Sequence, residues 1–254
     1  MASENWLIRT DHNHGVVELQ LARGPVNALC PEFLMDFAAE IEELGADDAV
    51  RAIVITSAFK VFSAGLDLKE AQEFDLSQQH AIVKGLNVGF LAQYRCPKPT
   101  VVAVGGAAIA GGLFFVLASD FRVAGPRSAF GLAEVRVGAD FPVGPLEIAR
   151  ATLSTDMQRK LMLTGQPIDV SAAQTAGLVD VVVDDVTQLT ARAVEEASKL
   201  AQLPPKTFAS VKQQLRQETI DRIETAMAAD GNAPEDGWFN DETRTAMRRM
   251  IGGA

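Results

Sequence analysis

Two glycine-containing turns and one later glutamate are the residues of this chain that could do chemistry. The first turn, Ser63-Ala64-Gly65, leads into Leu66, and the second is Ala110-Gly111-Gly112. Small residues let a ligand approach the main chain closely, so the N–H groups of Leu66 and Gly111 could donate to one oxygen atom. Glu134 could serve as a base beside those donors. The three groups together predict a site that forms an enolate and stabilises it.

Each turn taken alone also has a structural explanation. Ser63-Ala64-Gly65 could be an ordinary tight turn, and Gly111-Gly112 could merely let a helix pack against a strand. The functional interpretation of Gly111 is that its N–H begins a buried helix, where unpaired amides and the helix dipole favour negative charge. Only the combination of both turns with Glu134 favours catalysis.

The elements that must position these groups alternate between strands and helices. The patterns predict a hairpin of Trp6–Asp11 and Val16–Leu21, strands at Ala52–Thr56, Thr100–Val104 and Phe121–Ala124, and helices at Pro31–Leu44, Gln78–Tyr94, Gly112–Ala118, Thr207–Met227 and Asp241–Ile251. Continuous apolar strands that alternate with helices indicate an α/β layer structure. We expect a core over residues 1–199 and a C-terminal helical region over residues 200–254, which packs on that core or on a neighbouring subunit.

The composition of the 254-residue chain excludes several classes of protein. With 48% hydrophobic and 22% charged residues the chain is globular, and a net charge of -10 argues against nucleic acid or an anionic membrane as partner. The uncharged run Val101–Ala118 is interrupted by two glycine pairs, which favours strand, loop and helix over a membrane span. Cys30 and Cys96 make no disulfide framework, and Met1–Trp6 lacks signal-peptide features, so we expect a cytoplasmic protein.

Four segments carry a resemblance to a known family. They are Gly24-Pro25-Val26-Asn27-Ala28-Leu29, Phe62-Ser63-Ala64-Gly65-Leu66-Asp67-Leu68, Ala110-Gly111-Gly112 through Ser119-Asp120, and Phe130-Gly131-Leu132-Ala133-Glu134. Their order and spacing resemble the crotonase (enoyl-CoA hydratase/isomerase) superfamily from about Asn27 to Val183, and the helical tail matches more loosely.

The resemblance implies a ββα-spiral core, a homotrimer or dimer of trimers, and a coenzyme A thioester as substrate, with no other cofactor and no metal. It makes the N–H groups of Leu66 and Gly111 the donors to the thioester carbonyl oxygen and Glu134 the catalytic carboxylate. Substrate-binding positions by the same comparison are Ala28, Ala64, Gly65, Asp67, Leu68, Lys69, Phe114, Ala133 and Asp140. Lys69 would meet a phosphate, although a solvated surface lysine is an equally simple explanation.

One departure from the family pattern favours one of two reactions. Hydratases of the family have two glutamates, and the first would stand where this chain has Phe114. Hydration must activate water and protonate C2, whereas moving a double bond from C3 to C2 needs one carboxylate that takes a proton and returns it. The motifs therefore resemble Δ3,Δ2-enoyl-CoA isomerases most. The alternatives are a hydratase that uses Asp140 as its second acid, and an acyl-CoA-binding protein of little activity.

Several other residues have simpler explanations. Glu147 would begin a helix, where a carboxylate suits the helix dipole, while Asp140 stays open as a catalytic group. His12 and His14 are expected in a hairpin turn without acidic or cysteine partners, and His80 alone on a helix, so solvated histidines are favoured over metal ligands.

The last predicted helix carries two further candidates. Trp238-Phe239 could close over the pocket, although we favour an anchor for this helix in the core. Arg244, Arg248 and Arg249 could reach a coenzyme A phosphate from a neighbouring subunit, but a solvated basic face at a helix C-terminus is the simpler expectation.

Overall fold

A six-stranded sheet organises the protein, whose computed structural model describes residues 6–252. The strand order is β1-β2-β4-β6-β8-β11, in which β1 is antiparallel to β2 and every other pairing is parallel. The bounds are β1 Leu7–Asp11, β2 Val16–Leu21, β4 Ala52–Ser57, β6 Thr100–Val104, β8 Phe121–Ala124 and β11 Val181–Val182. The predicted hairpin and the three predicted strands are confirmed. The expectation about the first residues concerns Met1–Asn5, which lie outside the described range.

Two small sheets hold the segments in which the chemistry was predicted. Strands β3 (Ala28–Leu29) and β5 (Gly65–Leu66) pair in parallel, and β9 (Ala129–Gly131) lies between β7 (Ala107–Ile109) and β10 (Ile168–Asp169). Strands of two or three residues carry no readable hydrophobic alternation, so none of these was predicted. Strand, short strand and helix recur three times, as β4-β5-α3, β6-β7-α4 and β8-β9-α5. These ββα units confirm the predicted α/β fold class.

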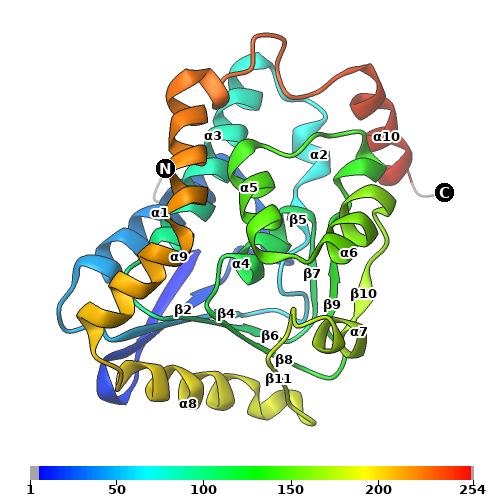
Figure 1. Ribbon diagram of the computed structural model, residues 1–254. Helices are drawn as coiled ribbons and strands as arrows, with labels where there is room; N and C mark the ends of the chain where they lie inside the picture. The colour runs from blue at the N-terminus through cyan, green and yellow to red at the C-terminus, as the bar shows by residue number, and fades with distance from the viewer. Residues whose placement is uncertain (1–5, 253–254) are drawn as a thin grey trace.

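Helices cover both faces of the large sheet. Their bounds are α1 Pro31–Ala46, α2 Leu68–Ala71, α3 Leu76–Arg95, α4 Phe114–Leu117, α5 Val143–Thr152, α6 Thr155–Gln158, α7 Val170–Thr175, α8 Leu189–Ala201, α9 Pro205–Ala226 and α10 Asp241–Ile251. Short 3₁₀ helices are η1 Asn13–Gly15, η2 Ala110–Leu113, η3 Glu134–Val137 and η5 Val186–Gln188, and π turns are η4 Arg159–Leu163 and η6 Met227–Gly231. Figure 1 shows α8 beneath the sheet and most other helices above it. No helix among residues 6–252 is both long and apolar enough to cross a membrane.

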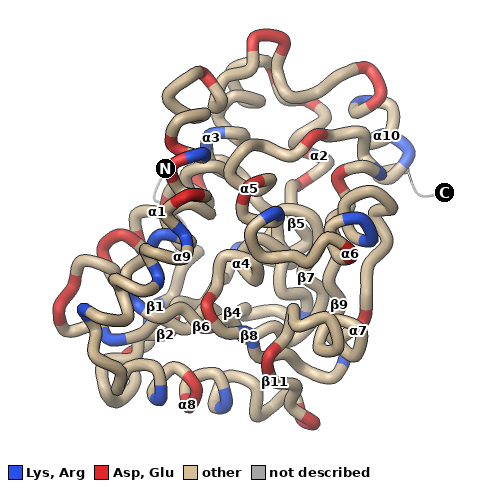
Figure 2. Tube along the Cα trace, viewed as in Figure 1, with Lys and Arg blue, Asp and Glu red and all other residues tan. Residues whose placement is uncertain are grey.

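The strands are buried on both faces, which explains their continuous apolar sequences. In β4, Ala52 and Val54 face a cluster with Ala193 and Ala197 of α8, while the alternate residues face the larger core. Burial of both faces requires apolar side chains at every position of a strand. Basic and acidic residues alternate along α8 in Figure 2. Arg192 and Lys199 of this helix pair with Glu195 and Glu196.

The C-terminal region packs on the core of its own chain. Lys212 and Arg216 of α9 each place a nitrogen 2.7 Å from the Asp120 carboxylate, which also accepts a hydrogen bond of 2.8 Å from the Thr100 amide. The Arg216 guanidinium lies 4.2 Å from the centre of the Tyr94 ring. These contacts join α9 to the sheet through one carboxylate. The predicted boundary at residue 199/200 falls near the end of α8, and the division into two domains stays a prediction.

Candidate active site

The two glycine turns lie side by side because main-chain hydrogen bonds join them. The amides of Phe62 and Ser63 donate to the carbonyl oxygen of Ala107, at 2.9 and 3.1 Å, and the Ile109 amide donates to the Ser63 carbonyl oxygen at 3.0 Å. Ser63 also forms an isolated parallel bridge with Ala108. The chain leaves this bridge on one side toward Gly65 and on the other toward Gly111, so the two predicted donor segments meet.

Gly65 makes the close approach of the segments possible. Its φ is +78°, and a β-carbon placed on it would lie 2.8 Å from the Ile109 carbonyl oxygen and 3.2 Å from the Gly111 nitrogen. No larger residue fits there without a displacement of backbone. Leu66 follows directly, in β5, and Gly111 is the second residue of η2, where an N–H has no acceptor within its own helix. The structure thus brings the two predicted donor residues together.

Ala110, the first residue of the predicted second turn, has a conformation that no sequence pattern indicated. Its φ is +49°, in the left-handed region that residues with a β-carbon rarely adopt. It immediately precedes Gly111 and lines the same pocket. Backbone strain of this kind persists only where the surroundings impose it, and it concentrates at functional sites. The turn at Ala110 sets the direction in which the Gly111 amide points.

Asn27 holds the first turn in place from behind. Its side-chain amide donates to the Phe62 carbonyl oxygen at 2.9 Å and to Ser57 Oγ at 2.8 Å, and Ser63 Oγ donates to the Asn27 carbonyl oxygen at 2.8 Å. A β-carbon on Gly112 would lie 2.6 Å from Ser63 Oγ. These contacts fix Ser63 between the two segments.

Glu134 is a buried carboxyl group without a compensating cation. It begins η3, its exposed fraction is 7%, and its Oε2 has no hydrogen-bond partner among the described residues. Burial raises its pKa from an ordinary 4.5 to about 8, and a hydrogen bond from its own backbone works in the opposite direction. A carboxyl group with these properties can both take and release a proton near neutral pH.

One apolar pocket contains the donors and the carboxyl group. Its lining residues are Ala64, Leu66, Leu68, Leu86, Ile109, Ala110, Gly111, Phe114, Ala133, Glu134, Val137, Ala139, Phe141, Pro142, Pro145, Trp238, Met247 and Met250. Glu134 is the single ionisable side chain in that set. The Phe114 ring is 1% exposed and lies 5.5 Å from the Phe90 ring and 6.3 Å from the Phe141 ring, measured between centroids. The centre of the site therefore consists of one carboxyl group in apolar surroundings.

Five of the predicted binding residues do not line this pocket. Gly65 lies behind it, and Ala28 is buried in β3. Asp67 caps α2, where its carboxylate accepts hydrogen bonds from the amides of Lys69 and Glu70 at 3.0 and 3.3 Å. Lys69 and Asp140 have exposed side chains, and Asp140 faces a neighbouring surface groove. Their predicted roles toward the substrate stay predictions.

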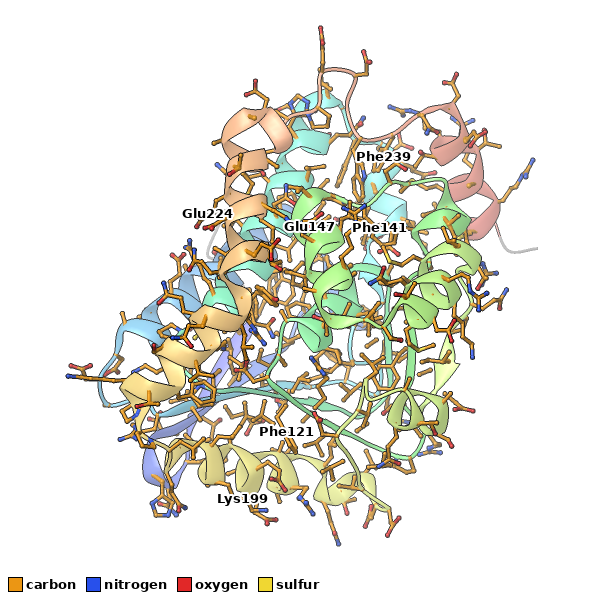
Figure 3. All side chains as sticks on the ribbon, viewed as in Figure 1. Phe121, Phe141, Glu147, Lys199, Glu224 and Phe239 are labelled. Atoms are coloured by element: carbon orange, nitrogen blue, oxygen red, sulfur yellow. The ribbon has the colours of Figure 1, made fainter. Side chains whose placement is uncertain are left out.

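Other expected residues have contacts that the sequence did not reveal. Glu147 (Figure 3) is buried within α5 rather than at its start. Arg150 and Arg222 pair with it at 2.6 and 3.4 Å. Its role is therefore structural, as expected, but it rests on ion pairs instead of the helix dipole. His12 does have an acidic partner, because a carboxylate oxygen of Glu18, six residues later in β2, lies 3.0 Å from its Nε2. Within the described part of the chain no group of three potential ligands could hold a metal ion.

The segment before α10 differs in part from expectation. Phe239 is buried and stacks on Phe74 with 6.5 Å between ring centroids, as an anchor would. Trp238, however, lines the pocket together with Met247 and Met250 of α10. The C-terminal segment is therefore both an anchor and a wall of the site. Arg248 and Arg249 are exposed.

Comparisons with known proteins agree with this geometry. The chain matches the enoyl-CoA hydratase/isomerase family over residues 11–249. It is 32% identical over 219 residues to a probable mitochondrial enoyl-CoA hydratase 2 of Arabidopsis thaliana, covering 85% of this chain and 70% of that one. It is 32% identical over 204 residues to 2,3-dehydroadipyl-CoA hydratase of Escherichia coli, covering 80% and 78%. The crystal structure of human mitochondrial Δ3-Δ2-enoyl-CoA isomerase superposes with a TM-score of 0.86 at 26% identity and covers 97% of both chains.

Proposed function

The chain belongs to the enoyl-CoA hydratase/isomerase family, and we propose that within this family it moves the double bond of a 3-enoyl-CoA thioester to the 2 position. One observation carries the proposal: among residues 6–252, Glu134 is the only ionisable side chain that lines the pocket, and Phe114 stands where a hydratase would need its other acid. Isomerisation needs one carboxylate, whereas hydration is usually divided between two. The similarity to the human isomerase supports the same choice.

The reaction begins when the thioester carbonyl oxygen accepts hydrogen bonds from the Leu66 and Gly111 amides. The Glu134 carboxylate removes a proton from C2, and the electron pair moves into a dienolate whose negative oxygen the two donors stabilise. Each such donor contributes about 3–4 kcal/mol to transition-state stability in comparable sites. Because the dienolate spreads its charge to C4, the protonated Glu134 returns the proton there and a double bond remains between C2 and C3.

The surroundings of Glu134 suit a group that carries one proton between two carbons. With a pKa of about 8, the carboxyl group is strong enough as a base to attack C2 and strong enough as an acid to protonate C4. The ring of Phe114 and the apolar lining would keep water from the dienolate. No cofactor is required beyond the coenzyme A that forms part of the substrate.

The expected location and assembly of the protein rest on other features. The two cysteines, Cys30 and Cys96, are both buried and unpaired, which suits a reducing compartment and supports a cytoplasmic protein. We expect a homotrimer or a dimer of trimers, in which a neighbouring chain could add contacts to the coenzyme A moiety near Lys69.

Hydration is the second candidate, because the names of the curated relatives are those of hydratases. A hydratase would need a second acid or a freely held water, and Asp140 is the nearest candidate in sequence. Its carboxylate would have to leave the surface to reach the pocket.

Ultraviolet absorbance of the conjugated thioester distinguishes the two reactions. The purified protein should raise the absorbance of a 3-enoyl-CoA and leave that of a 2-enoyl-CoA unchanged. Glu134→Gln should abolish the rise in absorbance while thioester binding persists. Asp140→Asn should change the rate of that rise by no more than about twofold. A fall of the 2-enoyl-CoA absorbance that depends on Asp140 would establish hydration instead. Binding without turnover on either substrate would identify an acyl-CoA-binding protein.

A further inference from the structure

The segment that carries Trp238 into the pocket has little packing of its own. It connects the π turn η6 to α10, and within residues 232–240 the side chain of Phe239 alone is buried. A polar connection of this kind does not by itself hold a large ring against a pocket. Its position therefore depends on specific contacts to the rest of the protein.

A buried amide supplies two of these contacts, beside those of His80 to Pro234 and Asn87 to Asn232. Gln79 of α3 is 4% exposed, and its Oε1 accepts hydrogen bonds from the backbone amides of Trp238 and Phe239, both at 2.9 Å. Its Nε2 donates to the Phe74 carbonyl oxygen at 3.3 Å. Both acceptor positions of the side chain are thus used by the segment, and its donor fixes the amide's orientation.

Gly237 shows that the contact is built into the local backbone. Its φ is +80°, and a β-carbon placed there would lie 2.5 Å from Gln79 Oε1. The glycine lets the chain approach the amide oxygen and turn so that two successive N–H groups point at it. A larger residue at this position would push the segment away from α3.

The opposite end of Trp238 is held by the loop that leads to the acyl pocket. Its Nε1 donates to the Asp140 carbonyl oxygen at 2.9 Å. The next residue, Phe141, lies against the Phe114 ring, with 6.3 Å between centroids. Figure 3 labels Phe141 and Phe239, which directly follow Asp140 and Trp238 in the sequence. Trp238, Phe141 and Phe114 all line the pocket, and the hydrogen bond to Asp140 joins Trp238 to the segment that carries Phe141.

We propose that Gln79 is a positioning residue that holds Trp238 as a wall of the acyl pocket, and that the pair limits the length of acyl chain the site accepts. The inference rests on the proposed use of this pocket for an acyl-CoA thioester. Gln79 itself lines no part of the pocket, so it acts through Trp238. Loss of the wall should enlarge the pocket, which favours long acyl chains over short ones.

Binding of saturated thioesters tests the proposal without any turnover. The affinity ratio of dodecanoyl-CoA to hexanoyl-CoA, measured by calorimetry, should rise about tenfold in Trp238→Ala. Gln79→Met, which removes the acceptor oxygen, should raise the ratio in the same direction. Gln213→Met, an exposed glutamine-to-methionine change on α9, is the matched control and should have no effect.

Fluorescence supplies a second measurement that does not depend on affinity. In a Trp6→Phe background Trp238 is the only tryptophan, and its emission should shift to longer wavelength in Gln79→Met as the ring meets more water. An unchanged ratio in Trp238→Ala, or an unchanged ratio and emission in Gln79→Met, would overturn the proposal. These readouts use saturated ligands and so do not depend on turnover. The role of Gln79 and Trp238 could therefore be confirmed even if the protein is not an isomerase, and it could fail even if the protein is one.

Discussion

Gly65 and Gly111 lie so close that a β-carbon on Gly65 would stand 3.2 Å from the Gly111 nitrogen and 2.8 Å from the Ile109 carbonyl oxygen. The two glycines are 46 positions apart in the sequence, and one parallel bridge between their segments brings them together. In the proposed reaction, this closeness would let the Leu66 and Gly111 amides donate to one substrate oxygen.

Gly65→Ala should therefore disable the donor pair. The new β-carbon must displace the backbone around Ile109 and Gly111, because no flexible side chain is available to move. Loss of one donor of this type lowers kcat about 100–1000-fold, measured as the rate of conjugated thioester formation. Gly177→Ala is the control, since Gly177 has φ of +73° but nothing within 4 Å of an added β-carbon. Equal losses in both variants would mean that backbone strain, not the donor contact, is responsible.

The activity should depend on pH through Glu134. The carboxyl group must be ionised to take the C2 proton, and its pKa in the folded protein is about 8. We expect kcat/KM to fall about tenfold for each pH unit below that value and to level off above it. A profile that is flat from pH 6 to 9 would contradict a role for Glu134 as the base.

Glu134 should also make the stability of the protein depend on pH, but stability should fall as the pH rises, whereas activity should increase. The pKa of Glu134 is raised on folding, so the folded state holds a proton that the unfolded state releases above about pH 4.5. The free energy of unfolding should consequently fall between about pH 4.5 and 8, relative to Glu134→Gln, by roughly 3–5 kcal/mol. Denaturant unfolding of both proteins across this range gives the difference. A constant difference would show that Glu134 is not buried in its neutral form.

Asp120 should be important for stability rather than for chemistry. Asp120→Asn leaves Lys212 and Arg216 facing a neutral amide in a buried setting, a change that costs about 3–5 kcal/mol in comparable pairs. Glu224→Gln is the control, since its pair with Arg95 is half exposed at 3.4 Å and should contribute no more than about 1 kcal/mol. Similar midpoints of urea unfolding for the two variants would contradict the importance of the Asp120 contacts.

Long elements and motif residues were the features that sequence could predict. The helix at Asp241–Ile251 and the strands at Thr100–Val104 and Phe121–Ala124 have the predicted bounds, because apolar patterns and caps define them locally. Leu66, Gly111 and Glu134 come together in one pocket for a related reason. Their backbone requirements, small residues and a helix start, are properties of short segments.

Features that depend on distant contacts could not be predicted. The helix expected at Gly112–Ala118 is a 3₁₀ turn that continues into the short α4, since packing against Ser63 determines its path. The place of Trp238 in the pocket depends on Gln79, which lies 159 positions away. The left-handed Ala110 has no sequence signature at all, because alanine does not normally adopt that conformation.

The apolar lining should make the site selective against acyl chains that end in a charge. Beyond Glu134 and the two donor turns, the pocket presents Leu86, Phe114, Phe141, Trp238 and Met247, and no lining side chain from residues 6–252 is a cation. An unpaired carboxylate buried there would cost several kcal/mol, so kcat/KM for a 3-enoyl-CoA ending in a carboxylate should be at least about 100-fold lower than for one ending in a methyl group. The methyl ester of the same diacid is the control, since it has similar length without the charge and should recover most of the activity. Equal rates for acid and ester would contradict the prediction and indicate a cation at the pocket that a single chain does not supply.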